Sequence, residues 1–115
     1  MRIGTVKELL DAQLIVGEGL LDHRVVSACG SDLMSDVLAF VKEQTLLLTG
    51  LNNPQVIRTA EMLDVSAIVF VRGKIPTPDI IEMAIDRDIV LLSTENTLFE
   101  ACGKLYEGGL RGRIT

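Results

Sequence analysis

The sequence has few of the residues that build catalytic and metal centres. It contains one histidine, His23, and two cysteines, Cys29 and Cys102, in 115 residues. No CxxC pair occurs, so the usual ligand spacing of a zinc site is absent. We interpret both cysteines as free thiols in apolar surroundings rather than as a redox pair. The sequence therefore predicts no metal and no cofactor.

Aromatic residues, basic clusters and long apolar runs are also scarce. Aromatics make up 3% of the chain, and the net charge is −5. The basic residues are scattered apart from Arg111 and Arg113, whereas nucleic-acid-binding proteins usually carry a basic stripe. The apolar runs at 46–48 and 67–71 are far shorter than the ~20 residues of a membrane span, and residues 1–4 do not open a secretory signal. We expect a cytoplasmic protein that binds neither nucleic acid nor a membrane.

Aliphatic side chains are what the chain has in excess. Hydrophobic residues make up 48% of it, and the mean hydropathy is +0.37. A chain of this length fits a single domain, predicted over 1–115, which can fold without a disulfide or metal. The excess has two interpretations: a tight monomer with both sheet faces covered, or a monomer whose apolar patch is buried against a partner. We favour the second interpretation, an apolar patch that is buried against a partner.

The apolar periodicity predicts strands alternating with helices. The predicted strands are 14–16, 24–29, 45–48, 67–71 and 89–92. A capping box of Thr5 with Glu8 predicts a helix to Asp11, and later helices are predicted to begin at Ser31 or Asp32, Asn53, Thr77 and Thr97. The predicted buried faces are Leu33, Met34, Val37, Leu38 and Val41; Val56, Ile57, Ala60 and Leu63; Ile80, Ile81, Ala84 and Ile85; and Leu98, Ala101, Cys102 and Leu105.

Consecutive strand–turn–helix units predict the fold class. Short, unbroken aliphatic strands are typical of parallel strands that are buried on both faces. Units of this kind form a mostly parallel sheet with right-handed crossovers. We therefore predict a three-layer α/β domain.

Polar loops follow three of the predicted strands. In an open parallel sheet, ligands gather at the carboxyl ends of the strands, and helix N-termini there suit an anion. The predicted ligand-binding residues are Thr49, Gly50, Asn52 and Asn53 in the first loop, Arg72, Gly73 and Lys74 in the second, and Ser93, Thr94, Asn96 and Thr97 in the third. These residue types are also the ordinary residues of turns and caps, an interpretation that we favour.

Motifs of catalysis are missing from these loops. Gly73-Lys74 lacks the rest of a phosphate-binding GxxxxGK[ST] loop, and no GxGxxG occurs. Ser27 and Ser93 lack a nucleophile elbow, and His23 is flanked by charged residues, as expected of an exposed histidine. Asp32 and Asp36 are spaced to share one helix face, which favours a solvated face over a cation site. We predict that the chain is not an enzyme.

Four runs of the sequence together resemble the DRTGG domain. They are 31–38, which reads SDLMSDVL, 46–51, which reads LLLTGL, 67–73, which reads AIVFVRG, and 90–101, which reads VLLSTENTLFEA. Their order and spacing carry the resemblance over nearly the whole chain. The pentapeptide that names the family is absent, because the corresponding stretch, 31–36, reads differently.

The resemblance implies an accessory domain. DRTGG domains lie between CBS domains in regulated inorganic pyrophosphatases and precede the catalytic domain in some phosphate acetyltransferases. They are similar in fold to the N-terminal domain of HPr kinase/phosphorylase, whose kinase chemistry belongs to a separate domain with a phosphate loop. The resemblance therefore implies an α/β module that commonly self-associates and has no active site of its own.

Three hypotheses about function follow, in different classes. The first is a regulatory or dimerising module that forms a homodimer and modulates a partner protein. The alternative is a sensor that binds a nucleotide or another phosphorylated metabolite at the three loops. The third hypothesis is an enzyme that uses His23 or the thiols.

Overall fold

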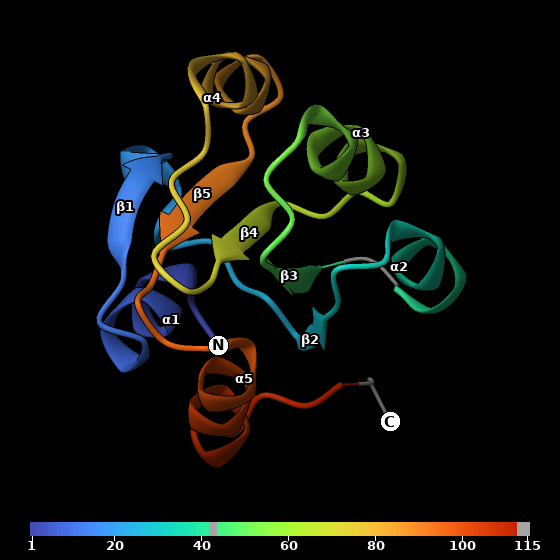
Figure 1. Ribbon diagram of the computed structural model, residues 1–115. Helices are drawn as coiled ribbons and strands as arrows, with labels where there is room; N and C mark the ends of the chain where they lie inside the picture. Colours follow the sequence, from blue (N-terminus) through green and yellow to red (C-terminus); the bar gives the residue numbers. More distant parts are fainter. Residues whose placement is uncertain (42–43, 113–115) are drawn as a thin grey trace.

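The computed structural model describes residues 1–41 and 44–112 (Figure 1). The helices in these ranges are α1 (Ile3–Leu9), α2 (Met34–Phe40), α3 (Pro54–Met62), α4 (Pro78–Asp86) and α5 (Leu98–Glu107), with a 3-10 turn at Glu18–Leu20. The strands are β1 (Gln13–Val16), β2 (Ser27–Gly30), β3 (Thr45–Thr49), β4 (Ala67–Phe70) and β5 (Val90–Ser93). None of the helices in these ranges has the length and apolar character needed to cross a membrane.

The strands form one sheet in the order β1-β5-β4-β3-β2. Strands β2 to β5 are parallel, with Ala28 opposite Leu46 and Ala67 opposite Val90. Strand β1 pairs antiparallel with β5 at one edge. Gly17 ends β1 with a φ of +104°, and a Cβ there would lie 2.8 Å from Val90 Cγ2. A side chain at this turn would be strained and would press on Val90, so glycine suits the position.

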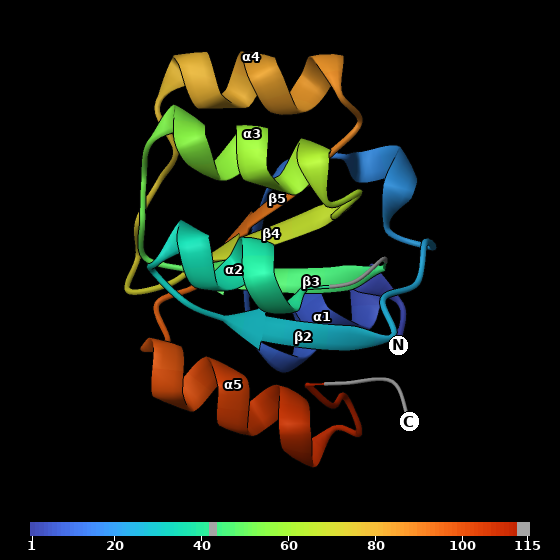
Figure 2. The ribbon, with the colours of Figure 1, turned by 90° about the vertical axis from the view of Figure 1, so that its right-hand side faces the viewer.

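The helices cover the two faces of the sheet unequally. Helices α2, α3 and α4 lie on one face, and α1 and α5 lie on the other (Figures 1 and 2). Alternate residues of the buried strands enter two separate clusters: Leu46, Leu48 and Val69 pack toward α1 and α5, whereas Leu47 and Ile68 pack toward α2, α3 and α4. The predicted three-layer, mostly parallel α/β fold is confirmed.

The start of α1 is a correction. The helix begins at Ile3 rather than at Thr5, and its N-cap residue, Arg2, offers no side-chain cap. Arg2 is held in extended conformation because it pairs antiparallel with Arg24. The helix therefore starts directly after this bridge, and the predicted Thr5–Glu8 capping box lies inside it.

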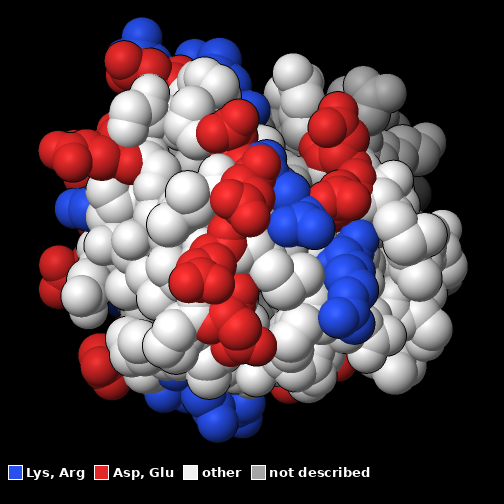
Figure 3. Space-filling view, turned by 90° about the horizontal axis from the view of Figure 1, so that it is seen from above, with Lys and Arg blue, Asp and Glu red and all other residues white. Residues whose placement is uncertain are grey.

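The outer helices also bury narrower faces than predicted. On α4, Ile80 and Ala84 are fully buried, but Ile85 is 57% exposed. At α2, the N-cap residue Leu33 and Leu38 within the helix are exposed, although both were predicted to face the core. Figure 3 looks onto this helical layer and shows acidic and basic side chains close together. The Arg87–Glu61 ion pair joins the end of α4 to α3.

Candidate functional site

The predicted loops lie together at the carboxyl ends of the parallel strands, which we call the carboxyl edge of the sheet. Because β3, β4 and β5 are parallel neighbours, the segments that follow Thr49, Phe70 and Ser93 leave at the same edge. The segment after β2 joins them there. The sequence therefore placed the candidate residues together, and what each does depends on its hydrogen bonds.

Asp32 closes the first loop. Its Oδ1 accepts a hydrogen bond from the Gly50 backbone N–H at 2.6 Å and another from Thr49 Oγ1 at 3.1 Å. Thr49 Oγ1 in turn accepts from the Leu51 N–H at 3.1 Å. The predicted role of Ser31 or Asp32 as cap of α2 is wrong: the N-cap residue is Leu33, and it makes no side-chain cap bond. Asp32 also lies outside α2, so it does not share a helix face with Asp36.

Arg72 belongs to the second loop, and its side chain reaches over to the first. Its backbone is left-handed, with a φ of +57°, and its N–H donates to the Asn96 carbonyl at 2.9 Å. A Cβ at Gly50 would collide with the Arg72 guanidinium, so the guanidinium packs directly on the glycine. This places an exposed cation at the carboxyl end of β3, against the same glycine whose N–H donates to Asp32.

Glu95 takes the corresponding place at the second loop. Gly73 has a φ of +68°, and a Cβ on it would lie 2.8 Å from Glu95 Oε2. The Gly73 N–H donates to the Thr94 carbonyl at 2.8 Å. Both glycines predicted to offer their amides to an anion therefore donate to oxygen atoms of this chain and stand beside a carboxylate.

The third loop is tied to the end of α1. Thr94 is buried, and its hydroxyl donates to the Leu10 carbonyl at 2.8 Å. Asn96 Nδ2 donates to the same carbonyl at 2.9 Å, and Lys104 Nζ donates to Asn96 Oδ1 at 2.8 Å. An open hollow of about 280 Å³ lies beside these bonds. It is lined by Leu10, Asp11, Thr94, Glu95, Asn96, Glu100 and Lys104.

The predicted caps divide into two groups. Asn53 accepts from the Gln55 N–H at 3.0 Å, and Thr97 accepts from the Glu100 N–H at 3.2 Å, so both cap their helices as predicted. Thr77 makes no side-chain cap bond; its hydroxyl donates to the Asp79 carboxylate instead, which lowers the pKa of Asp79. The caps formed by Asn53 and Thr97 are structural, because their side-chain oxygens already accept a backbone N–H of their own helix.

Two predicted residues hold the second loop from its sides. Ser93 Oγ donates to the Lys74 carbonyl at 2.7 Å. Asn52 Nδ2 donates to the Ile75 carbonyl at 2.9 Å, while its Oδ1 is buried without a hydrogen-bond partner. The Lys74 side chain is exposed. Asn52 Oδ1 is thus the unused buried acceptor at this edge.

The remaining candidates for chemistry lie apart from the loops. His23 is exposed, and Ser27 Oγ is hydrogen-bonded to Thr45 Oγ1 at 2.7 Å. Burial raises the pKa of the Cys29 and Cys102 thiols, which keeps them protonated and poorly nucleophilic. Over residues 1–41 and 44–112, no group of three or more His, Cys, Asp or Glu side chains is placed to hold a metal ion.

Sequence reasoning missed the two carboxylates that occupy this edge. Asp32 and Glu95 come from separate loops, and only the strand order brings each beside a glycine of its neighbour. A signal was present for Asp32, because it comes directly after the end of β2 at Gly30, much as Gly50 comes directly after the end of β3 at Thr49. No spacing in the sequence indicates the contact of Glu95 with Gly73.

We expect Asp32→Ala to destabilise the fold by about 1–2 kcal/mol, because the buried Gly50 N–H loses a charged acceptor. Asp32→Asn keeps an oxygen acceptor and should cost less than half as much. Urea unfolding of the three proteins measures the difference. Equal stability of Asp32→Ala and the unaltered chain would show that the bond contributes nothing.

Comparison with known proteins finds a similar fold among solved structures. No protein-family model matches the sequence, and no curated protein does either. Among solved structures, the chain is similar to the CBS and DRTGG domains of the regulatory region of a Clostridium perfringens pyrophosphatase, in complex with its activator diadenosine tetraphosphate. The TM-score is 0.69 at 16% identity. The chain has a DRTGG-like fold. The match covers 90% of this chain and 45% of that one, so the chain spans less than half the pyrophosphatase fragment.

Proposed function

We propose that this DRTGG-like chain is a regulatory module that forms a homodimer and modulates a partner protein without a chemical step of its own. The observation that carries the proposal is a gathering of exposed apolar side chains around the β2 edge of the sheet. Figure 2 faces this edge, with α2 above β2 and α5 below it. The exposed apolar side chains that α2 and α5 carry at this edge, which we call the β2-edge face, are Leu33, Leu38, Phe99 and Tyr106; they are 58%, 42%, 88% and 59% exposed.

Helix α5 presents aromatic residues to this face. Ala101 and Leu105 point into the core, and Lys104 lies on the flank toward α1. Phe99 and Tyr106 are seven residues apart and therefore share the opposite flank. Tyr106 lines a small apolar hollow of about 160 Å³ together with Ala28 of β2, which places this flank beside the edge strand. The Arg111 guanidinium stacks 3.9 Å from the centre of the Tyr106 ring and steadies it.

A second copy of the chain is the partner that this face fits best. Phe99 and Tyr106 are both exposed on one side of one helix, in a chain that has only three phenylalanines and one tyrosine. Exposed aromatic clusters of this kind are typical of protein interfaces. A two-fold axis through the face would bury each aromatic pair against its copy and close the assembly at two chains.

The absence of a chemical step is supported by how the nucleophiles are used. The hydroxyls of Ser27, Ser93 and Thr94 are hydrogen-bonded within the chain, and burial raises the thiol pKa values. The similar pyrophosphatase segment belongs to a regulatory region. We extend that role to this chain, with a catalytic protein as the partner it modulates.

Tyrosine fluorescence tests the homodimer. Tyr106 is the only tyrosine and the chain has no tryptophan, so its emission reports the β2-edge face alone. On dilution from about 100 micromolar, we expect iodide to quench this emission more strongly as the dimer dissociates. Quenching that stays constant and strong over the whole dilution series would contradict a dimer through this face.

The alternative function is a sensor for a nucleotide or another phosphorylated metabolite at the carboxyl edge of the sheet. The Arg72 guanidinium against Gly50 favours it as a partner for phosphate oxygens. The unused Asn52 Oδ1 is an acceptor, so it suits an N–H or O–H of the base or sugar and not the phosphate. Its obstacle is that Asp32 already accepts from the Gly50 N–H, so a bound anion would have to displace a carboxylate.

We expect a phosphorylated ligand of this edge to raise the melting temperature through mass action, and Arg72→Gln to remove the rise. A thermal-shift screen of nucleotides and sugar phosphates on both proteins measures it. Equal shifts in the two proteins would exclude Arg72 from binding.

A further inference from the structure

Residues 1–3 and 23–25 pair antiparallel at the end of the sheet where the parallel strands begin, opposite the end where the loops lie. The Val25 N–H donates to the Met1 carbonyl at 2.8 Å, and the Met1 nitrogen donates to the Val25 carbonyl at 3.0 Å. The Ile3 N–H donates to the His23 carbonyl at 2.8 Å. Ile3 and Val25 are fully buried. The backbone in this ladder is therefore fixed, and with it the direction of the side chains between the buried ones.

The ladder places two arginines directly opposite each other. Arg2 and Arg24 are partners in the antiparallel bridge, between the hydrogen-bonded pairs on either side. Side chains at such a non-hydrogen-bonded position are especially close, and like charges directly opposite destabilise the pairing. Because Ile3 and Val25 point inward, Arg2 and Arg24 both point to solvent.

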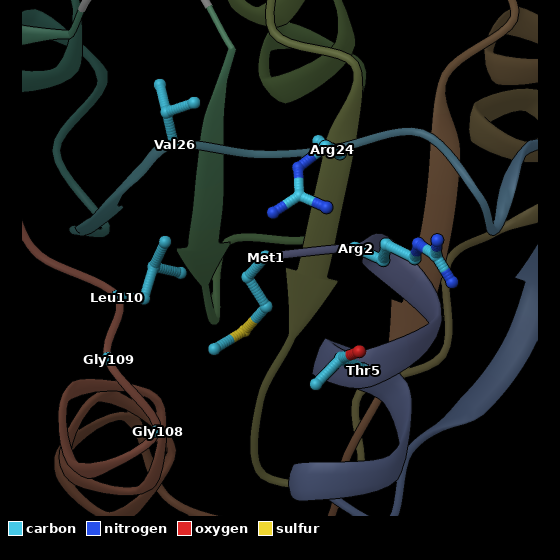
Figure 4. Close-up of a pocket in the computed structure, with 8 residues that line it drawn as sticks. All are labelled: Met1, Arg2, Thr5, Arg24, Val26, Gly108, Gly109 and Leu110. Carbon is cyan, nitrogen blue, oxygen red and sulfur yellow. The ribbon is translucent and has the colours of Figure 1, made fainter.

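The charges of Arg2 and Arg24 are not neutralised within the described part of the chain. Neither arginine forms a salt bridge there. In Figure 4 the Arg24 guanidinium points toward Met1, while the Arg2 side chain runs away from it along the other rim.

An open hollow of about 470 Å³ lies next to the arginines. It is lined by Met1, Arg2, Thr5, Arg24, Val26, Gly108, Gly109 and Leu110, with no acidic side chain among them. Met1, Val26 and Leu110 make one wall apolar, and the arginines make the other cationic (Figure 4). Volumes of this size hold nucleotide-sized ligands.

We propose that this hollow binds a diphosphate-bearing metabolite of nucleotide size, with its phosphates between Arg2 and Arg24. Guanidinium groups pair with phosphate oxygens in bidentate fashion, and two guanidiniums suit two linked phosphates. Both side chains are exposed and free to rotate inward. The apolar wall then accepts the uncharged part of the ligand. This site lies at the other end of the strands from Arg72, so it is independent of the sensor at the loops.

Calorimetric titration of the untagged chain with inorganic pyrophosphate and with adenosine diphosphate tests the proposal. Both ligands should bind at low salt, and adenosine should not. Arg2→Gln and Arg24→Gln should each weaken binding about tenfold or more, since each removes a charge-assisted contact. Arg58→Gln is the matched control, because Arg58 is an exposed arginine of α3 away from the hollow, and it should leave binding unchanged.

Arginine side-chain NMR signals locate the ligand independently of affinity. On addition of pyrophosphate, the Nε signals of Arg2 and Arg24 should shift together. No binding of either ligand at millimolar concentration would overturn the proposal. So would unchanged affinity in Arg24→Gln, loss of binding in Arg72→Gln alone, or binding of an acidic peptide in place of the phosphate compounds.

Discussion

A chain carrying Phe99→Glu and Tyr106→Glu is expected to be monomeric at concentrations at which the proposed homodimer of the unaltered chain forms. Each aromatic on the β2-edge face is a candidate hot spot, worth about 2 kcal/mol or more when removed. The new carboxylates also face their copies across the two-fold axis, where like charges repel. Together the substitutions should weaken association about 1,000-fold or more. Sedimentation equilibrium measures the two dissociation constants.

A matched variant separates this effect from a general effect of added charge. Met62 on α3 and Ile85 on α4 are 74% and 57% exposed and lie on the other helical layer. Met62→Glu with Ile85→Glu adds the same charge and should leave the dissociation constant within about twofold. If this control also dissociates the dimer, or if the aromatic variant does not, the interface lies elsewhere.

The second large effect is on stability: Phe70→Ala is expected to cost about 3–5 kcal/mol. Phe70 is fully buried at the end of β4, in the cluster with Ile57, Ile80 and Leu91 beneath α3 and α4. Truncation leaves a cavity in the centre of the sheet, and few neighbours can move to fill it. A domain of this size has roughly 5–15 kcal/mol of stability, so the variant approaches unfolding at room temperature.

Guanidinium unfolding followed by far-ultraviolet circular dichroism measures this cost. Ile85→Ala is the control, because Ile85 fits the helical periodicity of the core but is exposed; it should cost less than about 1 kcal/mol. If both variants lost similar amounts of stability, the burial described here would be wrong at α4.

Most of the fold was predictable from local pattern. The aliphatic runs near 45–48, 67–71 and 89–92 became β3, β4 and β5 with shifts of one residue at their ends. Asn53 and Thr97 cap as predicted, since a cap bond spans two or three residues and needs no tertiary partner. The parallel pairing was predictable because a predicted helix connects each of these strands to the next, as the crossover between parallel strands requires.

The errors occur where a distant segment overrides a local preference. Asp32 is a good cap residue, but Gly50 of the neighbouring strand end competes for its carboxylate, and α2 begins without a side-chain cap. The α1 start moved to Ile3 because Arg2 pairs with Arg24, more than twenty residues away. No short-range spacing contains either contact.

The candidate site shows the same division. That the loops after β3, β4 and β5 share one edge was predictable, because it depends only on parallel order. That their amides donate to Asp32 and to the Thr94 carbonyl was not, because those acceptors come from other loops. The left-handed backbone of Arg72, which aims its guanidinium at Gly50, was equally hidden, since arginine has no preference for that conformation.

Light scattering on the unaltered chain as it leaves a size-exclusion column tests the central proposal most directly. A module that works through a pair of identical chains should elute, at tens of micromolar, with twice the 12.5 kDa mass of one chain. A mass of 12.5 kDa at every concentration up to a millimolar would contradict it, because the aromatics of α5 would then face only water.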